Sequence, residues 1–235
     1  MKSASTGRWT NDSELFSLMR EKLFSAVIGD VLDKLGKYHQ FLPPYLRPLD
    51  PAMCLAGRAM PVLEADVFEE KGPPGNGPLR DRPFGLMFEA LDDLKPDEIY
   101  IATGASHRYA LWGELMSIRA GKLGAAGAVL DGYSRDTRGV LSLEFPTFSA
   151  GSYAQDQGPR GKVIDWRIPI EIGGVRIDPG TIIFGDRDGL VVIPQDLEEA
   201  VILGALEKVE GENRVAKALM DGMGALEAFK KFGIM

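Results

Sequence analysis

The hydrophobic residues between positions 15 and 35 recur every three or four positions, as they do along one face of a helix. They are Leu15, Phe16, Met19, Leu23, Val27, Val31 and Leu35. Asn11 precedes the run with Glu14 three positions on, which is an N-terminal capping pattern, and Gly36 follows as a stop signal. Because Ser25 can cap a second helix inside the run, the pattern predicts two short helices rather than one long one.

Beyond residue 54, strand-like and helix-like segments alternate. Strands are predicted over 55–67, 98–102 and 127–130, and helices over 84–94 and 113–123. Such alternation is typical of an α/β layer. The Pro- and Gly-rich segment 69–83 cannot hold regular structure, so we expect a surface loop there, with a mobile lid over a site as the alternative.

The last third of the chain is first β-rich and then helical. Alternating runs at 163–172 and 175–177 predict strands, and Asp186-Arg187-Asp188-Gly189 between apolar runs predicts a hairpin turn rather than a metal site. Helices are predicted from Asp196 to about Leu219 and over 225–232. Without a repeat or an evident linker, we expect one domain over 1–235, with N-terminal helices about 11–36, a core about 54–194 and C-terminal helices about 196–232.

Composition narrows the class of protein. The chain has 235 residues, 45% hydrophobic and 26% charged, which is ordinary for a globular protein. A net charge of -7 disfavours a nucleic-acid partner, because like charge repels phosphate. No stretch has the length of a membrane span, and the N-terminus lacks the apolar core of a signal peptide, so we expect a cytoplasmic protein with no membrane partner. Cys54, the single cysteine, is interpreted as a small buried hydrophobe.

The residues suited to binding and catalysis lie in two short segments. Gly113 opens the predicted helix 113–123, whose first amides lack internal partners and can bind an anion. The strand 127–130 leads to Arg135-Asp136, and ligands in α/β folds bind beyond the carboxyl ends of strands. Arg135 can bind a carboxylate or carbonyl oxygen, while Asp136 can hold a hard divalent cation, with Glu114 as a further oxygen ligand. Together these groups suit the stabilisation of an enolate formed from a 2-oxo acid.

These segments resemble the 4-hydroxy-4-methyl-2-oxoglutarate aldolase family, which also contains the regulator of ribonuclease activity A. That family carries an acidic residue or Gly, about twenty residues, and then Arg-Asp. Here Glu114 is followed by twenty residues and then Arg135-Asp136, with Trp112-Gly113 in front. Further similar segments are Ala26 to Gly36, Ala56-Gly57-Arg58-Ala59, Asp186 to Pro194 and the tail from Ala218 to Gly233.

The resemblance implies an α/β fold, an α-β-β sandwich with a swivelling β/β/α core flanked by N- and C-terminal helices. It also implies a homotrimer or homohexamer with sites between subunits. The activity would be that of a class II, metal-dependent pyruvate aldolase, a lyase that also decarboxylates oxaloacetate through a pyruvate enolate.

The resemblance also implies the role of each site residue. Asp136 would bind Mg²⁺ or Mn²⁺ directly, and Glu114 would hold the ion through water. Glu212 of a neighbouring subunit would do the same, with Glu210 as the alternative. Arg135 would bind the keto oxygen of a small 2-oxo acid. The amides of Leu115 and Met116, after Gly113, would hold the substrate carboxylate.

One departure from the family is visible. Position 139 is Gly, three residues after Asp136, where members often have an acidic residue that supports the site. The alternative function is a non-catalytic regulatory binding protein of the ribonuclease-regulator type, but that branch carries Gly where this chain has Glu114. Neither a phosphate-binding G-x-x-x-x-G-K-[ST] loop nor a G-x-S-x-G nucleophile motif is present.

Overall fold

A computed structural model describes residues 8–68 and 77–234. The helices are α1 (Asp12–Lys22), α2 (Ser25–Lys34), α3 (Met87–Asp92), α4 (Glu114–Lys122), α5 (Thr137–Ser142), α6 (Glu198–Met220) and α7 (Ala225–Phe232), with a 3-10 turn at Gln195–Leu197. The strands are β1 (Arg47–Pro48), β2 (Leu55–Asp66), β3 (Glu98–Thr103), β4 (Ala110–Trp112), β5 (Gly127–Leu130), β6 (Tyr133–Ser134), β7 (Thr147–Ser149), β8 (Gly161–Trp166), β9 (Ile170–Ile172), β10 (Val175–Ile177), β11 (Ile182–Asp186) and β12 (Gly189–Ile193).

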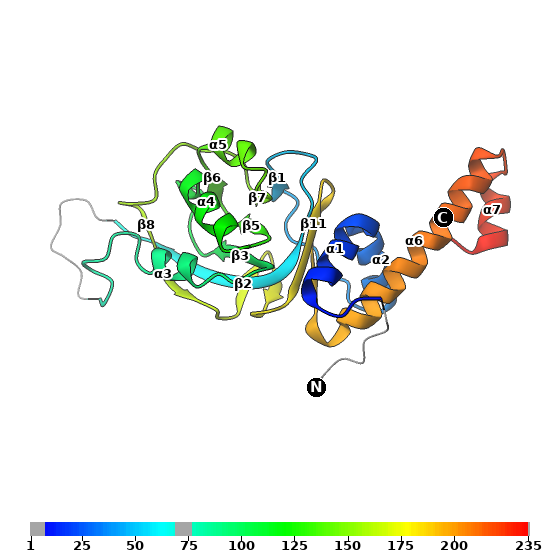
Figure 1. Cartoon of the computed structure of the whole chain (residues 1–235), viewed down its shortest axis with the longest axis horizontal. Coiled ribbons are helices and arrows are strands. Elements are labelled where there is room, and N and C mark those ends of the chain that lie inside the picture. The colour runs from blue at the N-terminus through cyan, green and yellow to red at the C-terminus, as the bar shows by residue number, and fades with distance from the viewer. Residues whose placement is uncertain (1–7, 69–76, 235) are drawn as a thin grey trace.

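The centre of the molecule is a mixed sheet. Among the described residues its order is β1-β7-β5-β3-β2-β11-β12, and β8 also pairs with β2. Strands β2, β3, β5 and β7 run parallel to one another. At the two sides of this parallel group, β1 pairs antiparallel with β7, β8 and β11 pair antiparallel with β2, and β12 pairs antiparallel with β11. Figure 1 shows the long β2 curving beneath the other strands, so that the sheet nearly closes on itself. The expected α/β fold is confirmed.

Alternation along the central strands separates two cores. On β3, Tyr100 and Ala102 join the core under α3 and α4, while Ile99 and Ile101 join the core formed with β9 and β10. Successive side chains of a strand point to opposite faces, which explains the division. Because both faces are covered, β3 between Ile99 and Ala102 and the whole of β5 are hydrophobic rather than alternating with polar residues.

A third core lies at the other end of the sheet. Helices α1, α2 and α6 pack against β11, β12 and the start of β2, around residues such as Phe16, Ile28 and Ile202. Figure 1 shows α6 running outward from this region, with α7 folded back along its far end. No helix in the described part of the chain is both long and apolar enough to cross a membrane.

The element predictions were confirmed with local corrections. Asn11 caps α1 by accepting a hydrogen bond from the amide of Glu14 at 2.9 Å. Ser25, however, is the first residue of α2 and not its cap; its hydroxyl donates to Asp186 at 2.7 Å. The predicted strand 163–172 is two strands, because the chain turns at Arg167, whose φ is 55°. Residues 69–76 of the predicted loop lie outside the described residues.

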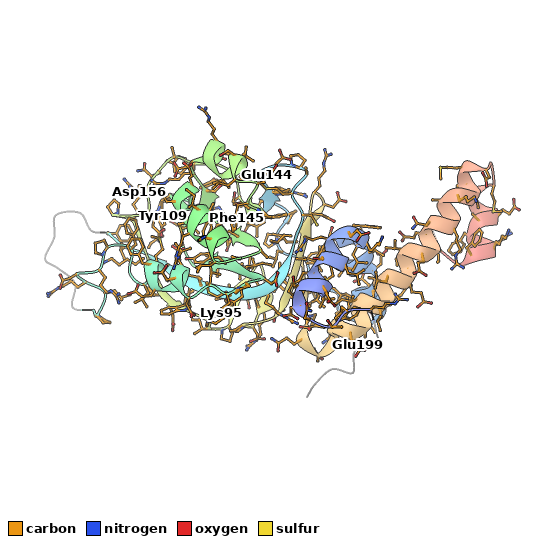
Figure 2. All side chains as sticks on the ribbon, in the orientation of Figure 1. Lys95, Tyr109, Glu144, Phe145, Asp156 and Glu199 are labelled. Carbon is orange, nitrogen blue, oxygen red and sulfur yellow. The ribbon has the colours of Figure 1, made fainter. Side chains whose placement is uncertain are left out.

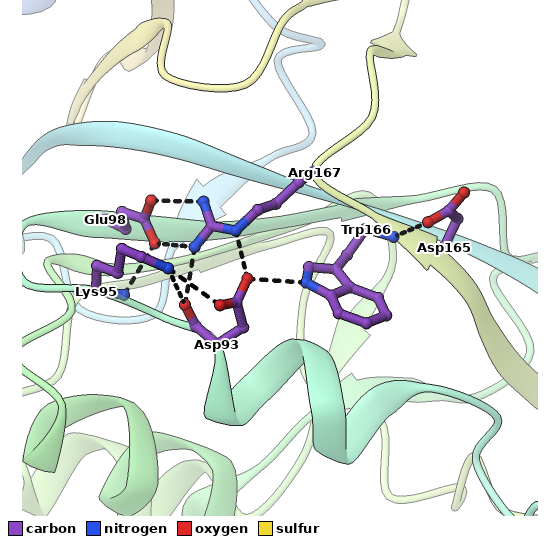
Figure 3. A network of polar contacts seen from close by, with 6 residues as sticks. All are labelled: Asp93, Lys95, Glu98, Asp165, Trp166 and Arg167. Atoms are coloured by element: carbon purple, nitrogen blue, oxygen red, sulfur yellow. Dashed lines mark hydrogen bonds and ion pairs between the residues drawn. The ribbon is translucent and has the colours of Figure 1, made fainter.

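Arg167 holds α3 against the sheet (Figure 3). Its guanidinium donates to both oxygens of Glu98, at 2.7 and 2.8 Å, and to the carboxylate and carbonyl oxygens of Asp93 at the end of α3. The indole of Trp166 donates to the same Asp93 carboxylate at 3.0 Å. Arg167 holds the pKa of the Asp93 carboxyl well below its usual range. This network fixes the position of α3, one wall of the pocket described below.

Candidate active site

Two short parallel strands bring the candidate residues together. Strand β4 pairs with β6, and the amide of Arg135 donates to the carbonyl oxygen of Trp112 at 2.9 Å. Trp112 is buried, and its indole donates to the Ser117 hydroxyl at 2.7 Å. The start of α4 and the Arg135-Asp136 segment are therefore neighbours, although twenty residues separate Glu114 from Arg135.

The N-terminus of α4 is free to bind an anion. Gly113 is its N-cap and has no side chain with which to bond the exposed amides. The amides of Glu114, Leu115 and Met116 come before the first internal hydrogen bond of the helix, which runs from Ser117 to Gly113. A Cβ atom at position 113 would come within 2.7 Å of Asp136 Oδ2, so only glycine lets this carboxylate approach the helix.

Asp136 has an unusual backbone conformation. Its φ and ψ are 54° and 34°, in the left-handed region, which is uncommon for a residue with a side chain. It is the N-cap of α5, yet its side chain makes no capping hydrogen bond. An Asp at this position ordinarily bonds to the first turn of its helix. Here the carboxylate lies beside Gly113 instead, where it is available to a ligand.

Arg135 is held by a residue that the sequence did not indicate. Its Nη1 lies 2.7 Å from Oδ1 of Asp156, and its Nε lies 3.7 Å from Oδ2 of Asp136. Asp156 also accepts from the amide of Gly158 at 2.9 Å. Figure 2 shows Asp156 at the end of the molecule far from α6. Its segment, residues 150–160, lacks regular structure, so no hydrophobic period marked it as part of a site.

Glu114 lies over Gly139. A Cβ atom at position 139 would overlap the Cδ, Oε2 and Cγ atoms of the Glu114 side chain. Gly139 is in α5 and Glu114 begins α4, so the two helices meet at this contact. The absence of a side chain at 139, which departs from the family pattern, therefore makes room for the Glu114 carboxylate.

A pocket of about 380 Å³ opens between α3, α4 and the Arg135 segment. Its polar end is formed by Gly113, Arg135, Asp136, Asp156 and Gln157. Apolar side chains form the remaining wall: Phe84, Met87, Phe88, Leu91, Ala110, Leu111, Trp112, Leu115 and Met116. The pocket thus unites five residues of the sequence prediction, namely Gly113, Leu115, Met116, Arg135 and Asp136; Glu114 lies just outside it.

A buried carboxyl group supports the floor of the pocket. Glu64 on β2 is 2% exposed, and its Oε2 accepts from the Gln157 amide nitrogen at 2.7 Å. Its other oxygen has no partner in the described part of the chain. Burial raises the pKa of Glu64 to about 8, so the carboxyl is largely protonated at neutral pH. Glu64 fixes Gln157 next to Asp156, and no motif or spacing along the chain pointed to Glu64 or Gln157 as part of the site.

Three further polar residues, among them the candidate Glu212, lie outside the pocket lining. Asp131 accepts from the hydroxyls of Tyr45 and Thr103, both at 2.7 Å. His107 lies 3.7 Å from Asp131 and outside the pocket lining. Glu212 is on α6, where Lys208 donates to it at 2.6 Å. Its expected role concerned a neighbouring subunit, so it stays a prediction, as does the trimer or hexamer.

The site is compatible with a hard divalent cation that needs only one or two protein ligands. Within residues 8–68 and 77–234, no three acidic, His or Cys side chains gather to enclose a metal. Mg²⁺ commonly takes one or two carboxylates and keeps several waters. Asp136, with no capping bond, fits a direct ligand, and the Glu114 carboxylate over Gly139 is a second oxygen donor nearby.

Known proteins are similar to this chain in sequence. The family model described as RraA-like, Aldolase/RraA, matches residues 25–192. A protein of Halalkalibacterium halodurans named putative 4-hydroxy-4-methyl-2-oxoglutarate aldolase is 34% identical over 145 residues, which are 61% of this chain and 68% of that protein.

Solved structures extend the likeness over most of the chain. A structure described as novel cellulases from microbes associated with the gut ecosystem has a TM-score of 0.78 and 28% identity, and the match covers 91% of each chain. Streptomyces coelicolor RraAS2, described as an unusual member of the RNase ES inhibitor RraA family, has a TM-score of 0.72 at 22% identity, over 87% of this chain and 97% of that one. At 22% identity, the likeness to RraAS2 shows a similar fold and no more.

Proposed function

The chain belongs to the RraA-like family of aldolases and RraA proteins, and from this premise we propose that it is a divalent-metal-dependent lyase that cleaves a 2-oxo acid through a pyruvate enolate. The observation that carries the proposal is the meeting of the α4 N-terminus with Arg135 and Asp136 at one pocket. An anion site, a guanidinium and an uncommitted carboxylate are the groups that enolate chemistry needs.

The substrate carboxylate binds to the free amides of Leu115 and Met116 at the start of α4, where the helix dipole favours negative charge. Arg135, held by Asp156, donates to the 2-keto oxygen. As the bond between C3 and C4 breaks, this oxygen gains negative charge, and the fixed guanidinium stabilises it more in the transition state than in the substrate.

Asp136 and, through water, Glu114 would hold Mg²⁺ or Mn²⁺, which supplies Lewis-acid polarisation of the 2-oxo acid when bound. In an aldol cleavage the C4 hydroxyl loses its proton, C4 becomes a carbonyl carbon, and C3 of the enolate takes up a proton to give pyruvate. Glu114, which lies just outside the pocket lining, is the candidate that accepts and returns this proton. Loss of CO₂ from oxaloacetate would give the same enolate.

The test measures pyruvate release from 4-hydroxy-4-methyl-2-oxoglutarate and from oxaloacetate with Mg²⁺, with Mn²⁺ and with excess chelator. We expect release that the chelator abolishes and that Asp136→Asn reduces at least about 100-fold, in the range for loss of an electrostatic stabiliser. Asp221→Asn, an exposed Asp at the end of α6, is the matched control and should be as active as the wild type.

Two results would contradict the proposal. Full activity of Asp136→Asn, or release that persists in chelator, would exclude the metal-dependent mechanism. A folded protein that releases no pyruvate from any 2-oxo acid would favour the non-catalytic, regulatory function instead.

A further inference from the structure

The pocket has more room than the reacting part of the substrate requires. Its volume is about 380 Å³, within the range of about 300–1,000 Å³ typical of small-molecule sites. The pyruvyl unit, three carbons and three oxygens, occupies the polar end near Gly113 and Arg135 in the mechanism above. The rest of the substrate, beyond C4, must then face the α3 side of the pocket.

The α3 side is apolar. Met87, Phe88 and Leu91 project from α3, and Phe84 precedes the helix with its ring edge-to-face against Phe88, the centroids 5.7 Å apart. Across the pocket lie Leu111, Leu115 and Met116. Phe88 and Leu115 are 55% and 79% exposed, so apolar surface at the rim is uncovered and gains free energy when a ligand buries it.

The charges around the pocket disfavour a second carboxylate on the substrate. Among the described residues that line it, Arg135 is the single cation, and it is already paired with Asp156 at 2.7 Å. Asp136 and Asp156 add two negative charges to the same lining. A carboxylate at the distal end of a substrate would lose its water against apolar side chains without gaining a cation, which is costly.

The pocket floor is also fixed rather than adaptable. Gln157 is 4% exposed, and its amide is bonded to the buried Glu64 at 2.7 Å. The backbone carbonyl of the same residue accepts from the amides of Arg160 and Gly161, at 2.7 and 2.9 Å. Both the side chain and the backbone carbonyl of Gln157 are therefore held in place.

We propose that the pocket selects 2-oxo acids whose distal group is uncharged and apolar, in particular 4-hydroxy-2-oxo acids with an alkyl or aryl group at C4, over dicarboxylic 2-oxo acids. The inference rests on the proposed lyase function and narrows its substrate class. The cleavage is balanced: the C4 hydroxyl proton is removed, the C3–C4 bond breaks to give an aldehyde, and C3 is protonated to give pyruvate. No oxidant or reductant is required.

The experiment compares kcat/KM for two nearly isosteric probes, 4-hydroxy-2-oxopentanoate and 4-hydroxy-2-oxoglutarate, which differ by a methyl in place of a carboxylate. We expect the pentanoate to be preferred at least about tenfold, because the glutarate must desolvate its distal carboxylate; tenfold corresponds to about 1.4 kcal/mol. Lengthening to the hexanoate and heptanoate should raise kcat/KM about fourfold per buried methylene. Oxaloacetate should have a lower kcat/KM than each of the three alkyl probes.

A charge placed on the apolar wall provides the second measurement. Phe88→Lys, at an exposed position on α3, should shift the ratio of the two probes toward the glutarate by about tenfold or more, because it gives the distal carboxylate a cation. Phe229→Lys is the matched control, since Phe229 is 52% exposed and lies on α7. It should leave the ratio unchanged.

The outcomes separate the two proposals. Pyruvate release with equal or greater kcat/KM for the glutarate, or a probe ratio that Phe88→Lys does not move, overturns the substrate class and leaves the lyase function intact. Release from none of the probes, with the protein folded, overturns the lyase function itself.

Discussion

The carboxylate of Glu114 lies directly over Gly139, in the space that any side chain at position 139 would occupy. One residue begins α4 and the other is in α5, so the contact ties the start of α4 to the segment that follows Asp136. The glycine is therefore a condition for the position of the glutamate and not a defect in the site. Its φ is not positive, so the constraint is one of space and not of backbone conformation.

Gly139→Ala should reduce kcat while preserving the fold. Alanine is the better helix former, by about 1 kcal/mol, but its methyl group would displace the Glu114 carboxylate. We expect a loss of at least about tenfold in kcat, since proton transfer by a positioned side chain contributes about 10²–10⁴-fold. Steady-state kinetics with thermal unfolding would measure both effects.

Gly121→Ala is the control for this substitution. Gly121 is in α4, and a Cβ atom there would meet Phe145 at an ordinary 3.8 Å. This variant should be fully active and slightly more stable. If Gly139→Ala were as active as Gly121→Ala, the present position of the Glu114 carboxylate would not matter for the reaction.

Metal binding should stabilise the folded protein through Asp136. A ligand at 100 times its dissociation constant adds about 2.7 kcal/mol, which corresponds to several degrees in Tm for a chain of this size. We expect Mn²⁺ or Mg²⁺ to raise the Tm of the wild type but not of Asp136→Asn. Asn tolerates the left-handed conformation that position 136 requires, so this variant should fold normally in the absence of metal. An equal metal-induced shift in both proteins would show that Asp136 is not the ligand.

Glu64 should make the stability of the protein fall as pH rises. The pKa of its carboxyl is raised from 4.5 to about 8 by burial, so between these values the folded state retains a proton that the unfolded state has released. The contribution of Glu64 to stability is fully present below about pH 4.5 and is lost as the pH rises through 8. Tyr100 on β3 and Tyr109, the residue before β4, are the titratable groups that interact with Glu64, and burial raises the pKa of both hydroxyls.

Glu64→Gln tests this dependence, because glutamine stays neutral and can still accept from Gln157. Denaturant unfolding from pH 5 to 9 should show the variant gaining stability relative to the wild type toward pH 9. Glu171→Gln, at an exposed position on β9, should follow the wild-type profile. Parallel profiles for Glu64→Gln and the wild type would mean that the buried carboxyl does not titrate in this range.

Arg167→Gln should destabilise the protein and weaken substrate binding together. The guanidinium side chain is 29% exposed and binds both Asp93 and Glu98 (Figure 3), so its loss leaves partly buried carboxylates without a partner. We expect a loss of about 1–3 kcal/mol in the free energy of unfolding. KM should rise more than kcat falls, since the network positions α3 and not the reacting groups.

Arg176→Gln provides the comparison for the Arg167 variant. The Arg176 side chain is 70% exposed and pairs with Asp178 at 2.7 Å. Exposed ion pairs contribute about 0–1 kcal/mol, so this variant should be close to the wild type in stability and in KM. Equal effects of the two substitutions would contradict the supporting role assigned to Arg167.

The sequence by itself determined the elements and part of the site. Hydrophobic periodicity located α1 and α2, because each has one buried face, and short apolar runs located β2, β5 and the hairpin of β11 and β12, because these strands are buried along most of their length. The spacing of Gly113, Glu114, Arg135 and Asp136 identified the two segments that meet. Such signals can be recognised without knowledge of the fold, because each depends only on residue types and their spacing along the chain.

Only the tertiary structure decided which other residues complete the site. Asp156 reaches Arg135 from a segment without regular structure, Glu64 supports Gln157 from 93 positions away, and Glu114 occupies the space above Gly139. It also placed the apolar side chains of α3 opposite Arg135, which sets the expected substrate class. None of these contacts has a period or a fixed spacing along the chain, because each depends on how separate elements pack against the sheet and not on the local sequence.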